Sequence, residues 1–485
     1  MNKQVMKCYL EVLAPVHVGC DEVYEPTGFS VDEAKRCLYS FDLMDFFSGL
    51  NSAERTKFQS LCQRGTLESV RDIYRFMQNR KPSGRSIALC EGFIEHYRKV
   101  LKMPEKQLQN EMNRFEISRT SYCSIDQRPY IPGSSVKGAL RTAFLNKMAV
   151  KIPIGTPKGK DAGEQLENAL LKLSNARPQD RVSLDPFRMV KVSDFIPVGE
   201  IATRIVYVVN EKKQPSDQLA RGPYQILEVI LPGAVFAGEI SVEKPAKTGA
   251  VSITMDMNQL LSTAGSFYTK EKKREDTILE QIGVGIVRGA DDDATLIRVG
   301  RHSGAESVTI EGHREIKIMQ GRGKPSLTKD HATTLWFVSE TQKPNNKKAF
   351  RPFGWAALSA ITDEMVQKLE QMENDYQQID RPSLDTGIRK YEHMPDLESA
   401  AEESSQPVLS KVEPVREIWS QPVLTWDPGK KEVTALFKGK KATAKGQDLV
   451  PEAYHVGLFG KKKKATPQKV VVEPYGNAMR IIEIA

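Results

Sequence analysis

Residues 129–148 read Pro-Tyr-Ile-Pro-Gly-Ser-Ser-Val-Lys-Gly-Ala-Leu-Arg-Thr-Ala-Phe-Leu-Asn-Lys-Met and combine a turn signal with a helical pattern. Pro132-Gly133 forms the turn. Ser134 or Ser135 is then expected to cap the helix, because a serine hydroxyl accepts a hydrogen bond from an otherwise unpaired backbone N–H. The pattern therefore predicts a helix that starts directly after a tight turn.

The same helix carries an apolar face and a basic face. Lys137 lies one turn in and Arg141 four residues later, close to a helix start that offers free N–H groups and a partial positive charge. Such a start suits a phosphate. An ordinary capped surface helix is the alternative reading. The residues predicted to form the apolar face are Val136, Leu140, Ala143 and Phe144.

Composition sets wide bounds. The chain has 485 residues and a formal net charge of +8, so two to four domains are expected and a polyanionic partner is only weakly favoured. No apolar run approaches the length of a membrane span, and the first residues lack a signal-peptide core. We therefore expect a cytoplasmic protein that does not bind a membrane. The six cysteines form no C-x-x-C pair, so zinc spacing is absent.

The periodicity divides the chain into strands and helices. A strand over 5–18 and a hairpin over 28–41 precede a helical insertion at about 42–115, with helical spacing in 42–50, 53–62, 66–78 and 86–102. Strand patterns dominate again after residue 182, a helix is expected near 256–282, and residues 334–338 and 353–358 are expected to form a final strand pair. These patterns give four predicted segments: 1–180, a first unit that includes the insertion; 181–362, a second unit; 363–426, an acidic linker; and 427–485, a small basic β module.

The basic module has two readings. Residues 427–470 hold 11 lysines, and Lys461–Lys464 are expected in a loop between strands. The module could bind nucleic acid, or it could be a soluble lysine-rich β domain, since lysine runs often serve solubility alone.

Signatures of catalysis are absent from the sequence. No H-E-x-x-H, G-x-S-x-G or G-x-x-x-x-G-K-[ST] motif occurs, and the glycines at 133 and 138 are followed by Ala139-Leu140 instead of lysine and a hydroxyl. The acidic run at 291–293 is interpreted as a solvated loop, with a divalent metal as the alternative. We therefore expect no catalytic residue, no metal and no cofactor.

Three glycine-rich basic loops remain, one with Gly19, one with Gly133 and one over residues 300–304. Glycine lets a backbone approach a ligand closely, successive N–H groups form an anion nest, and Arg or His adds charge and a stacking surface for RNA. Each loop alone is better explained as a tight turn with a solvated side chain, but three together favour a phosphate backbone. The residues predicted to bind RNA are His17, Gly19, Gly133, Ser134, Ser135, Lys137, Arg141, Arg298, Arg301, His302 and Arg314.

These segments resemble the RAMP superfamily of CRISPR effector proteins. The likeness is closest to the type III-A subunit that caps the end of the Csm backbone holding the 3′ part of the guide RNA. It is carried by Leu13–Gly19, by the hairpin Phe29–Phe41, by the turn and helix at 130–143, and by Arg298–Gly304 with Phe353-Gly-Trp. Cys20 departs from the pattern, since glycine or serine is usual there. The resemblance covers about residues 5–360.

The resemblance implies an α+β fold with a ferredoxin-like or RRM-like core in two related halves, with helical insertions. It implies a non-catalytic subunit that binds guide RNA (crRNA) by its backbone, caps its 3′ end, and supports crRNA maturation and antiviral defence. The implied partners are crRNA, target RNA, the other Csm subunits, above all the repeated backbone subunit, and host trimming nucleases.

Two alternatives assign a ribonuclease activity. Backbone subunits of such complexes that cut target RNA carry an aspartate in a glycine-rich loop after the first strand, where this chain has Asp21 and Asp32. Both are interpreted as turn residues, because an aspartate in a turn usually bonds its own backbone. The second alternative is a stand-alone endoribonuclease that processes precursor crRNA, with His17 as general base.

Overall fold

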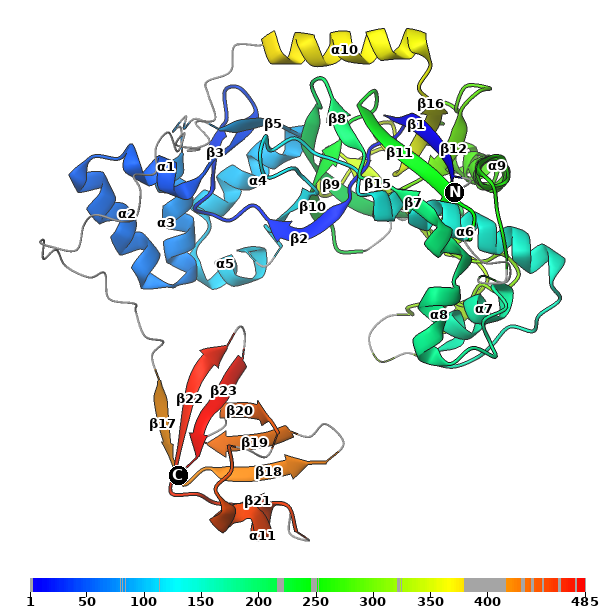
Figure 1. Cartoon of the computed structure of the whole chain (residues 1–485). Helices are drawn as coiled ribbons and strands as arrows, with labels where there is room; N and C mark the ends of the chain where they lie inside the picture. Colours follow the sequence, from blue (N-terminus) through cyan, green and yellow to red (C-terminus); the bar gives the residue numbers. More distant parts are fainter. Residues whose placement is uncertain are drawn as a thin grey trace, which may run out of the picture. The chain divides into compact units, whose positions relative to one another are not determined.

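The computed structural model describes residues 3–78, 80, 82, 84–112, 114–215, 222–245, 251, 253–320, 323, 325–378, 416–428, 432–437, 440–446, 449–460, 464–475 and 478–484. The chain forms two compact units, residues 1–389 and 390–485. Helices and sheets are mixed throughout the first unit, which confirms the α+β class (Figure 1).

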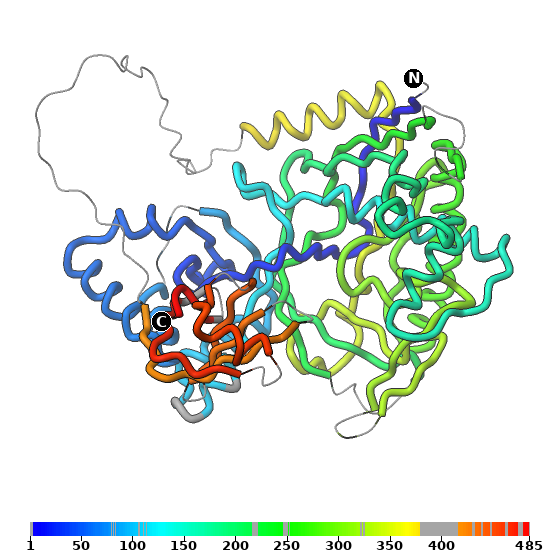
Figure 2. The backbone as a smooth tube through the Cα atoms, turned by 60° about the horizontal axis from the view of Figure 1, so that its bottom comes forward, coloured from blue at the N-terminus to red at the C-terminus, as the bar shows by residue number. Residues whose placement is uncertain are grey.

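The first sheet brings together strands from both ends of the first unit. Its order is β12 (Thr295–Arg298), β16 (Trp355–Ala360), β1 (Lys3–Val12), β11 (Val235–Glu243) and β7 (Val190–Val192), and β8 (Ile196–Val198) also pairs with β11. β1 runs antiparallel to both of its neighbours, with Leu10 opposite Phe236 and Leu358. Figure 2 shows this N-terminal strand, in dark blue, among green and yellow segments from much later in the chain.

The second sheet holds the predicted hairpin at one end. Its order is β2 (Gly19–Val23), β6 (Ile117–Thr120), β10 (Gln225–Ile230), β9 (Thr203–Lys212), β5 (Arg85–Leu89), β4 (Cys37–Ser40) and β3 (Phe29–Asp32), and β15 (Thr334–Ser339) also pairs with β9. The predicted hairpin is confirmed, since β3 and β4 pair directly. A short separate hairpin consists of β13 (Ile316–Ile318) and β14 (Leu327–Lys329).

Two groups of helices flank the sheets, one at each end of the first unit in Figure 1. The predicted insertion contains α1 (Leu43–Ser48), α2 (Ser52–Arg64), α3 (Leu67–Met77), α4 (Glu91–Lys102) and α5 (Glu105–Met112). The other group contains α6 (Gly133–Lys151), α7 (Ala162–Leu170), α8 (Pro178–Leu184) and α9 (Met257–Ile282). α6 and α9 pack against each other and against β12, so that their apolar residues share one core with the first sheet.

The C-terminal unit has its own apolar core and a single sheet. Its order is β17 (Glu417–Ser420), β22 (Lys469–Tyr475), β23 (Ala478–Ile484), β20 (Lys440–Lys445), β19 (Glu432–Phe437), β18 (Val423–Asp427) and β21 (Lys464–Ala465), with the short α11 (His455–Leu458). The sheet therefore begins ten residues before the predicted boundary at 427. Lys464 opens β21, and Lys461–Lys463 lie outside the described residues. Nucleic-acid binding by this unit stays a prediction.

Several boundaries differ from those expected. The start of the helical segment predicted over 86–102 belongs instead to β5 (Arg85–Leu89), because Ile87 and Leu89 alternate into the core. The strands near 334 and 353 belong to different sheets, so they are not a pair. The predicted boundary at residue 180 does not divide the first unit into two separate sheets. β1 precedes this boundary in the sequence, but it lies between β11 and β16, which both follow it. The predicted linker begins with α10 (Asp363–Gln378), and residues 379–415 lie outside the described residues. Among the described residues, no helix combines the length and apolar character that a membrane crossing requires.

Candidate nucleic-acid interface

The three glycine-rich loops predicted from the sequence meet at one place in the first unit. They surround a hollow of about 390 Å³, which we call the three-loop hollow. Its lining comes from the turn that leads into β2 and the first residue of β2, from the first turns of α6, from Tyr268 of α9, and from the end of β12 with the loop after it. The lining residues used below are Gly19, Ser134, Ser135, Gly138, Thr142 and Arg301.

The loop after β12 packs directly onto the turn before β2. Gly300 has a φ of +83°, and a Cβ atom there would lie 2.6 Å from the carbonyl oxygen of His17. The next residue, Arg301, donates its backbone N–H to the same oxygen over 2.8 Å. Only glycine combines this left-handed conformation with so close an approach. Gly300 therefore holds the two loops together.

Arg301 lies across Gly19 with its guanidinium half exposed. A Cβ on Gly19 would come within 2.8 Å of the guanidinium carbon, so glycine leaves the room that the arginine occupies. Asp21 pairs with Arg301 over 3.0 Å, and the aspartate side chain is 92% exposed. An ion pair so exposed contributes little to stability. A phosphate can therefore displace Asp21 from the guanidinium at small cost.

The start of α6 differs from the expected serine cap. The N-cap is Pro132, no side chain caps the helix, and Ser134 and Ser135 lie inside the first turn. Gly133 donates its N–H to the Asp194 carboxylate over 2.8 Å. A Cβ on Gly133 would lie 2.5 Å from two backbone carbonyl oxygens of the β7 region. Gly133 thus serves close packing, which corrects its predicted role as a phosphate ligand.

One face of α6 offers only small residues to the hollow. Ser134 and Gly138 are exposed, Ser135 and Thr142 are half-buried, and nothing lies within 4 Å of the place where a Gly138 side chain would stand. Residues three to four apart share one face of a helix. The sequence analysis missed Gly138 and Thr142, although their spacing from the serines is visible in the printed sequence. This face lets a ligand approach the helix backbone and meet hydroxyl groups.

The two cations of α6 have different surroundings. Arg141 donates to both Glu167 and Asp185, at 2.8 and 2.9 Å, so its guanidinium is engaged within the protein. Lys137 is half-buried and has no carboxylate within ion-pair distance among the described residues. Burial, helped by the nearby Lys191 ammonium, lowers the pKa of Lys137. An anion beside Lys137 would stabilise its charged ammonium, whereas the Arg141 guanidinium already has two carboxylate partners. Of these two cations, Lys137 is therefore the better candidate for a phosphate ligand. The exposed Lys191 on β7 was not predicted.

The two predicted histidines are structural. His17 is fully buried, and its Nδ1 lies 2.8 Å from the carbonyl oxygen of Glu228. Burial lowers the pKa of His17. Burial, with smaller contributions from His17 and Arg301, lowers the pKa of His302 to about 4. His302 packs against the rings of Trp336 and Phe353. A neutral, enclosed His17 cannot reach RNA, which argues against its predicted roles as RNA ligand and general base.

Two of the predicted arginines belong to the core. Arg298 is 4% exposed and donates to Glu275 over 2.5 Å and to the carbonyl oxygen of Phe353 over 2.9 Å. Arg314 donates to Glu271 over 2.9 Å, and only 9% of its side chain is exposed. Buried arginines paired in this way hold elements together and are not available to an external phosphate. Both predictions of RNA contact are therefore corrected.

Acidic clusters do not gather at the hollow. Within the described part of the chain, no three His, Cys, Asp or Glu side chains come together in a way that could hold a metal ion. Asp32 is buried and accepts the backbone N–H of Lys35 over 2.9 Å, as expected of a turn residue. Asp21 has a φ of +59° and binds Arg301. The hollow thus combines small residues, hydroxyls and the Arg301 guanidinium, which suits a phosphodiester backbone, while Lys137 lies on α6 outside this lining.

The sequence profile of the RAMP superfamily matches residues 9–282, which is more than half of the chain. The chain belongs to the RAMP superfamily. The matched range contains the end of β1, the turn with Gly19 and α6, and it includes the second sheet except β15. The loop that carries Arg301 lies beyond the matched range.

Curated relatives of this RAMP protein cover only part of it. A Methanocaldococcus jannaschii protein named CRISPR system Cms protein Csm5 is 26% identical over 198 residues, which is 39% of this chain and 42% of that protein. A Mycobacterium tuberculosis protein of the same name is 38% identical over 78 residues, which is 14% of this chain and 20% of that protein. The chain therefore matches less than half the length of these relatives.

Solved structures also resemble this RAMP protein. A chain in a cryo-EM structure of a Csm–crRNA–target RNA ternary complex of a type III-A CRISPR-Cas system has 18% sequence identity and a TM-score of 0.46, covering 73% of this chain and all of that one. A crystal structure of T. onnurineus Csm5 has 17% identity and a TM-score of 0.39, covering 72% of this chain and 99% of that one.

Proposed function

We propose that this RAMP protein is a guide-RNA-binding subunit of a type III-A CRISPR complex, and that it holds the RNA backbone at the three-loop hollow. The observation that carries the proposal is the meeting of three sequence-distant loops around one small-residue surface that includes Arg301. Lys137, on α6 but outside this lining, adds a second cation without a carboxylate partner among the described residues. Membership of the RAMP superfamily and the relatives named Csm5 support it. Phosphates fix register while leaving base edges free, as a guide requires.

The finer role follows from the same proposal. The protein would cap the 3′ end of the crRNA filament, contact the repeated backbone subunit and meet target RNA through the guide. It would support crRNA maturation by setting the boundary at which host nucleases stop trimming. Lengths of crRNA co-purified with complexes that contain or lack this subunit test that role, and a lengthened 3′ end without it is the expected result.

The double variant Lys137→Ala/Arg301→Ala is expected to weaken crRNA binding about 10- to 100-fold, because each cation contributes a charge-assisted contact to phosphate. The slope of log affinity against log salt should become shallower by about 1.4, since single strands release about 0.7 counterions per contact. Fluorescence anisotropy with labelled crRNA at several salt concentrations measures both quantities.

Two control variants accompany that measurement. Lys151→Ala removes an exposed cation from the far end of α6 and should leave both quantities unchanged. Arg141→Ala breaks the ion pairs with Glu167 and Asp185 and should lower stability more than affinity. An unchanged salt slope in the double variant would show that RNA binds elsewhere.

We also propose that the subunit holds RNA without cutting it. Asp21→Asn and Asp32→Asn are each expected to leave target-RNA cleavage by the assembled complex unchanged. The Asp32 carboxylate supports a turn, and Asp21 pairs with Arg301. Gel analysis of cleaved target RNA measures this. If Asp21→Asn abolished cleavage while RNA binding persisted, the ribonuclease alternative would be correct.

A further inference from the structure

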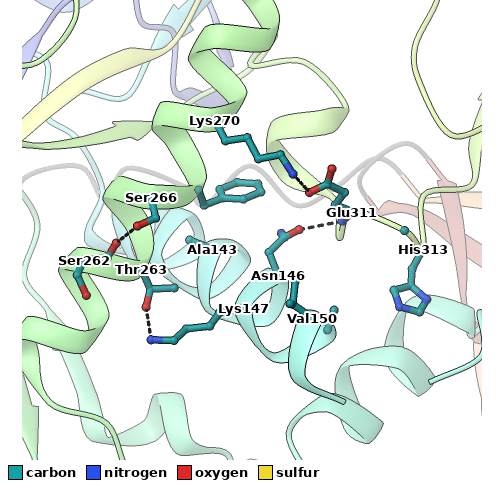
Figure 3. A pocket seen from close by; sticks show the side chains of 13 residues that line it. Ala143, Asn146, Lys147, Val150, Ser262, Thr263, Ser266, Lys270, Glu311 and His313 are labelled. Carbon is teal, nitrogen blue, oxygen red and sulfur yellow. Dashed lines mark hydrogen bonds and ion pairs between the residues drawn. The ribbon is translucent and has the colours of Figure 1, made fainter. Parts of the chain in front are cut away.

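A second concave surface lies between α6 and α9, next to the three-loop hollow along α6. We call it the α6–α9 groove; its volume is about 600 Å³ (Figure 3). α6 contributes Ala143, Asn146, Lys147 and Val150, and α9 contributes Ser262, Thr263, Ser266 and Phe267 to its lining. A volume of this size accommodates several side chains of a bound segment.

The α6 side of the groove is partly apolar and unusually open. Val150 is 88% exposed, although it stands on a helix whose other apolar residues are mostly buried. Phe267 and Ala143 form an apolar wall that is continuous with the core. Leaving Val150 in water costs free energy that burial against a partner would recover, at about 25 cal/mol per Å².

Of the two lysines that line the groove, one has a carboxylate partner among the described residues and the other does not. Lys270 pairs with Glu311 over 2.6 Å, and the Asn146 side chain accepts the Glu311 backbone N–H over 2.8 Å. His313 bonds the hydroxyl of Thr156 over 3.1 Å. Lys147 reaches only the hydroxyl of Thr263, at 3.0 Å, and meets no carboxylate in the described part of the chain (Figure 3).

We infer that the α6–α9 groove docks a segment of another protein subunit that places an apolar side chain beside Val150 and a carboxylate beside Lys147. A carboxylate would complete the ion pair that Lys147 lacks, and oppositely charged groups across an interface fix its register. RNA is the less suitable occupant, because the Glu311 carboxylate and the apolar wall formed by Phe267 and Ala143 offer nothing to a phosphate. The inference takes its partner from the complex of the proposed function.

Site-specific crosslinking identifies the occupant in the assembled complex. The full chain carries p-benzoylphenylalanine at position 150 and is co-expressed with its complex subunits and guide RNA. Mass spectrometry is expected to find crosslinks to a peptide of a different protein that holds an apolar residue and an Asp or Glu within about one helical turn. The same label at position 182, where Val182 is 79% exposed outside the groove, is the matched control.

Charge reversal then tests the predicted ion pair. Lys147→Glu is expected to lower retention of that subunit about tenfold. Lysine in place of the partner carboxylate should restore retention, and Lys151→Glu should have no effect. Each of four results would overturn the inference: crosslinks to RNA, crosslinks to a second copy of this chain, equal labelling at positions 150 and 182, or failure of the charge swap.

The crRNA affinity of the isolated Lys147→Glu chain should be unchanged. A failure of the proposed RNA site would instead appear in the Lys137→Ala/Arg301→Ala measurements.

Discussion

Arg298→Met is expected to lower the free energy of unfolding of the first unit by about 3–5 kcal/mol, because it leaves the Glu275 carboxylate buried without its cation. Glu275 is fully buried on α9 and also accepts the indole N–H of Trp355 over 2.7 Å. Arg298, Glu275 and Trp355 thereby connect the end of β12, the C-terminal half of α9 and the start of β16. Urea denaturation monitored by circular dichroism measures the change.

Two further variants test whether the loss of stability comes from the unpaired buried charge of Glu275 or simply from the removal of an arginine. Arg298→Met/Glu275→Gln should recover part of the stability, since a neutral glutamine can still accept from Trp355 and no buried charge remains. Arg177→Met removes a cation of the exposed Arg177–Asp180 pair and should change stability by less than about 0.5 kcal/mol. Equal stability of the Arg298→Met protein and the native protein would refute the core role of Arg298.

Gly300→Ala is expected to destabilise the first unit and to weaken crRNA binding together. Alanine at a φ of +83° is strained, and its Cβ would press on the His17 carbonyl oxygen, so the loop must move and carry Arg301 with it. Left-handed strain costs about 1–2 kcal/mol, and forced overpacking adds about 1–3 kcal/mol. Thermal melts and RNA titrations on one preparation measure both effects.

Gly233→Ala is the matched control, because Gly233 has a φ of +90° but nothing within 4 Å of its missing side chain. It should cost the left-handed strain alone and leave crRNA affinity unchanged. If the two glycine variants behaved alike, the close approach of Gly300 to His17 would not matter to the loop.

The features of the fold that depend on a local sequence pattern could be predicted from the sequence. The apolar face of α6 follows from the spacing of Val136, Leu140, Ala143 and Phe144, all of which are buried. The hairpin of β3 and β4 follows from alternating residues around a turn, and its pairing is as expected. The three glycine-rich loops were identified as related sites, and the structure brings them to one hollow.

The sequence could not predict which cations are buried or paired, because their carboxylate partners lie far away in the sequence. Arg298 and Arg301 are three residues apart and look alike in the sequence, yet one is buried against Glu275 and the other is half exposed. Lys137 and Arg141 share a helix, but among the described residues only Arg141 forms ion pairs, with Glu167 of α7 and with Asp185 after α8. No local periodicity indicates which of two cations a distant carboxylate will neutralise.

The position of β1 has a consequence for the synthesis of the protein. β1 leaves the ribosome long before the two strands that it pairs with, which end at residues 243 and 360. At translation rates of about 5–20 residues per second, β1 waits roughly 20–70 s for its second neighbour. Its unpaired edges and apolar face stay exposed during that time, so the nascent chain is a natural client for chaperones. The first sheet can be completed only after nearly all of the first unit has been translated.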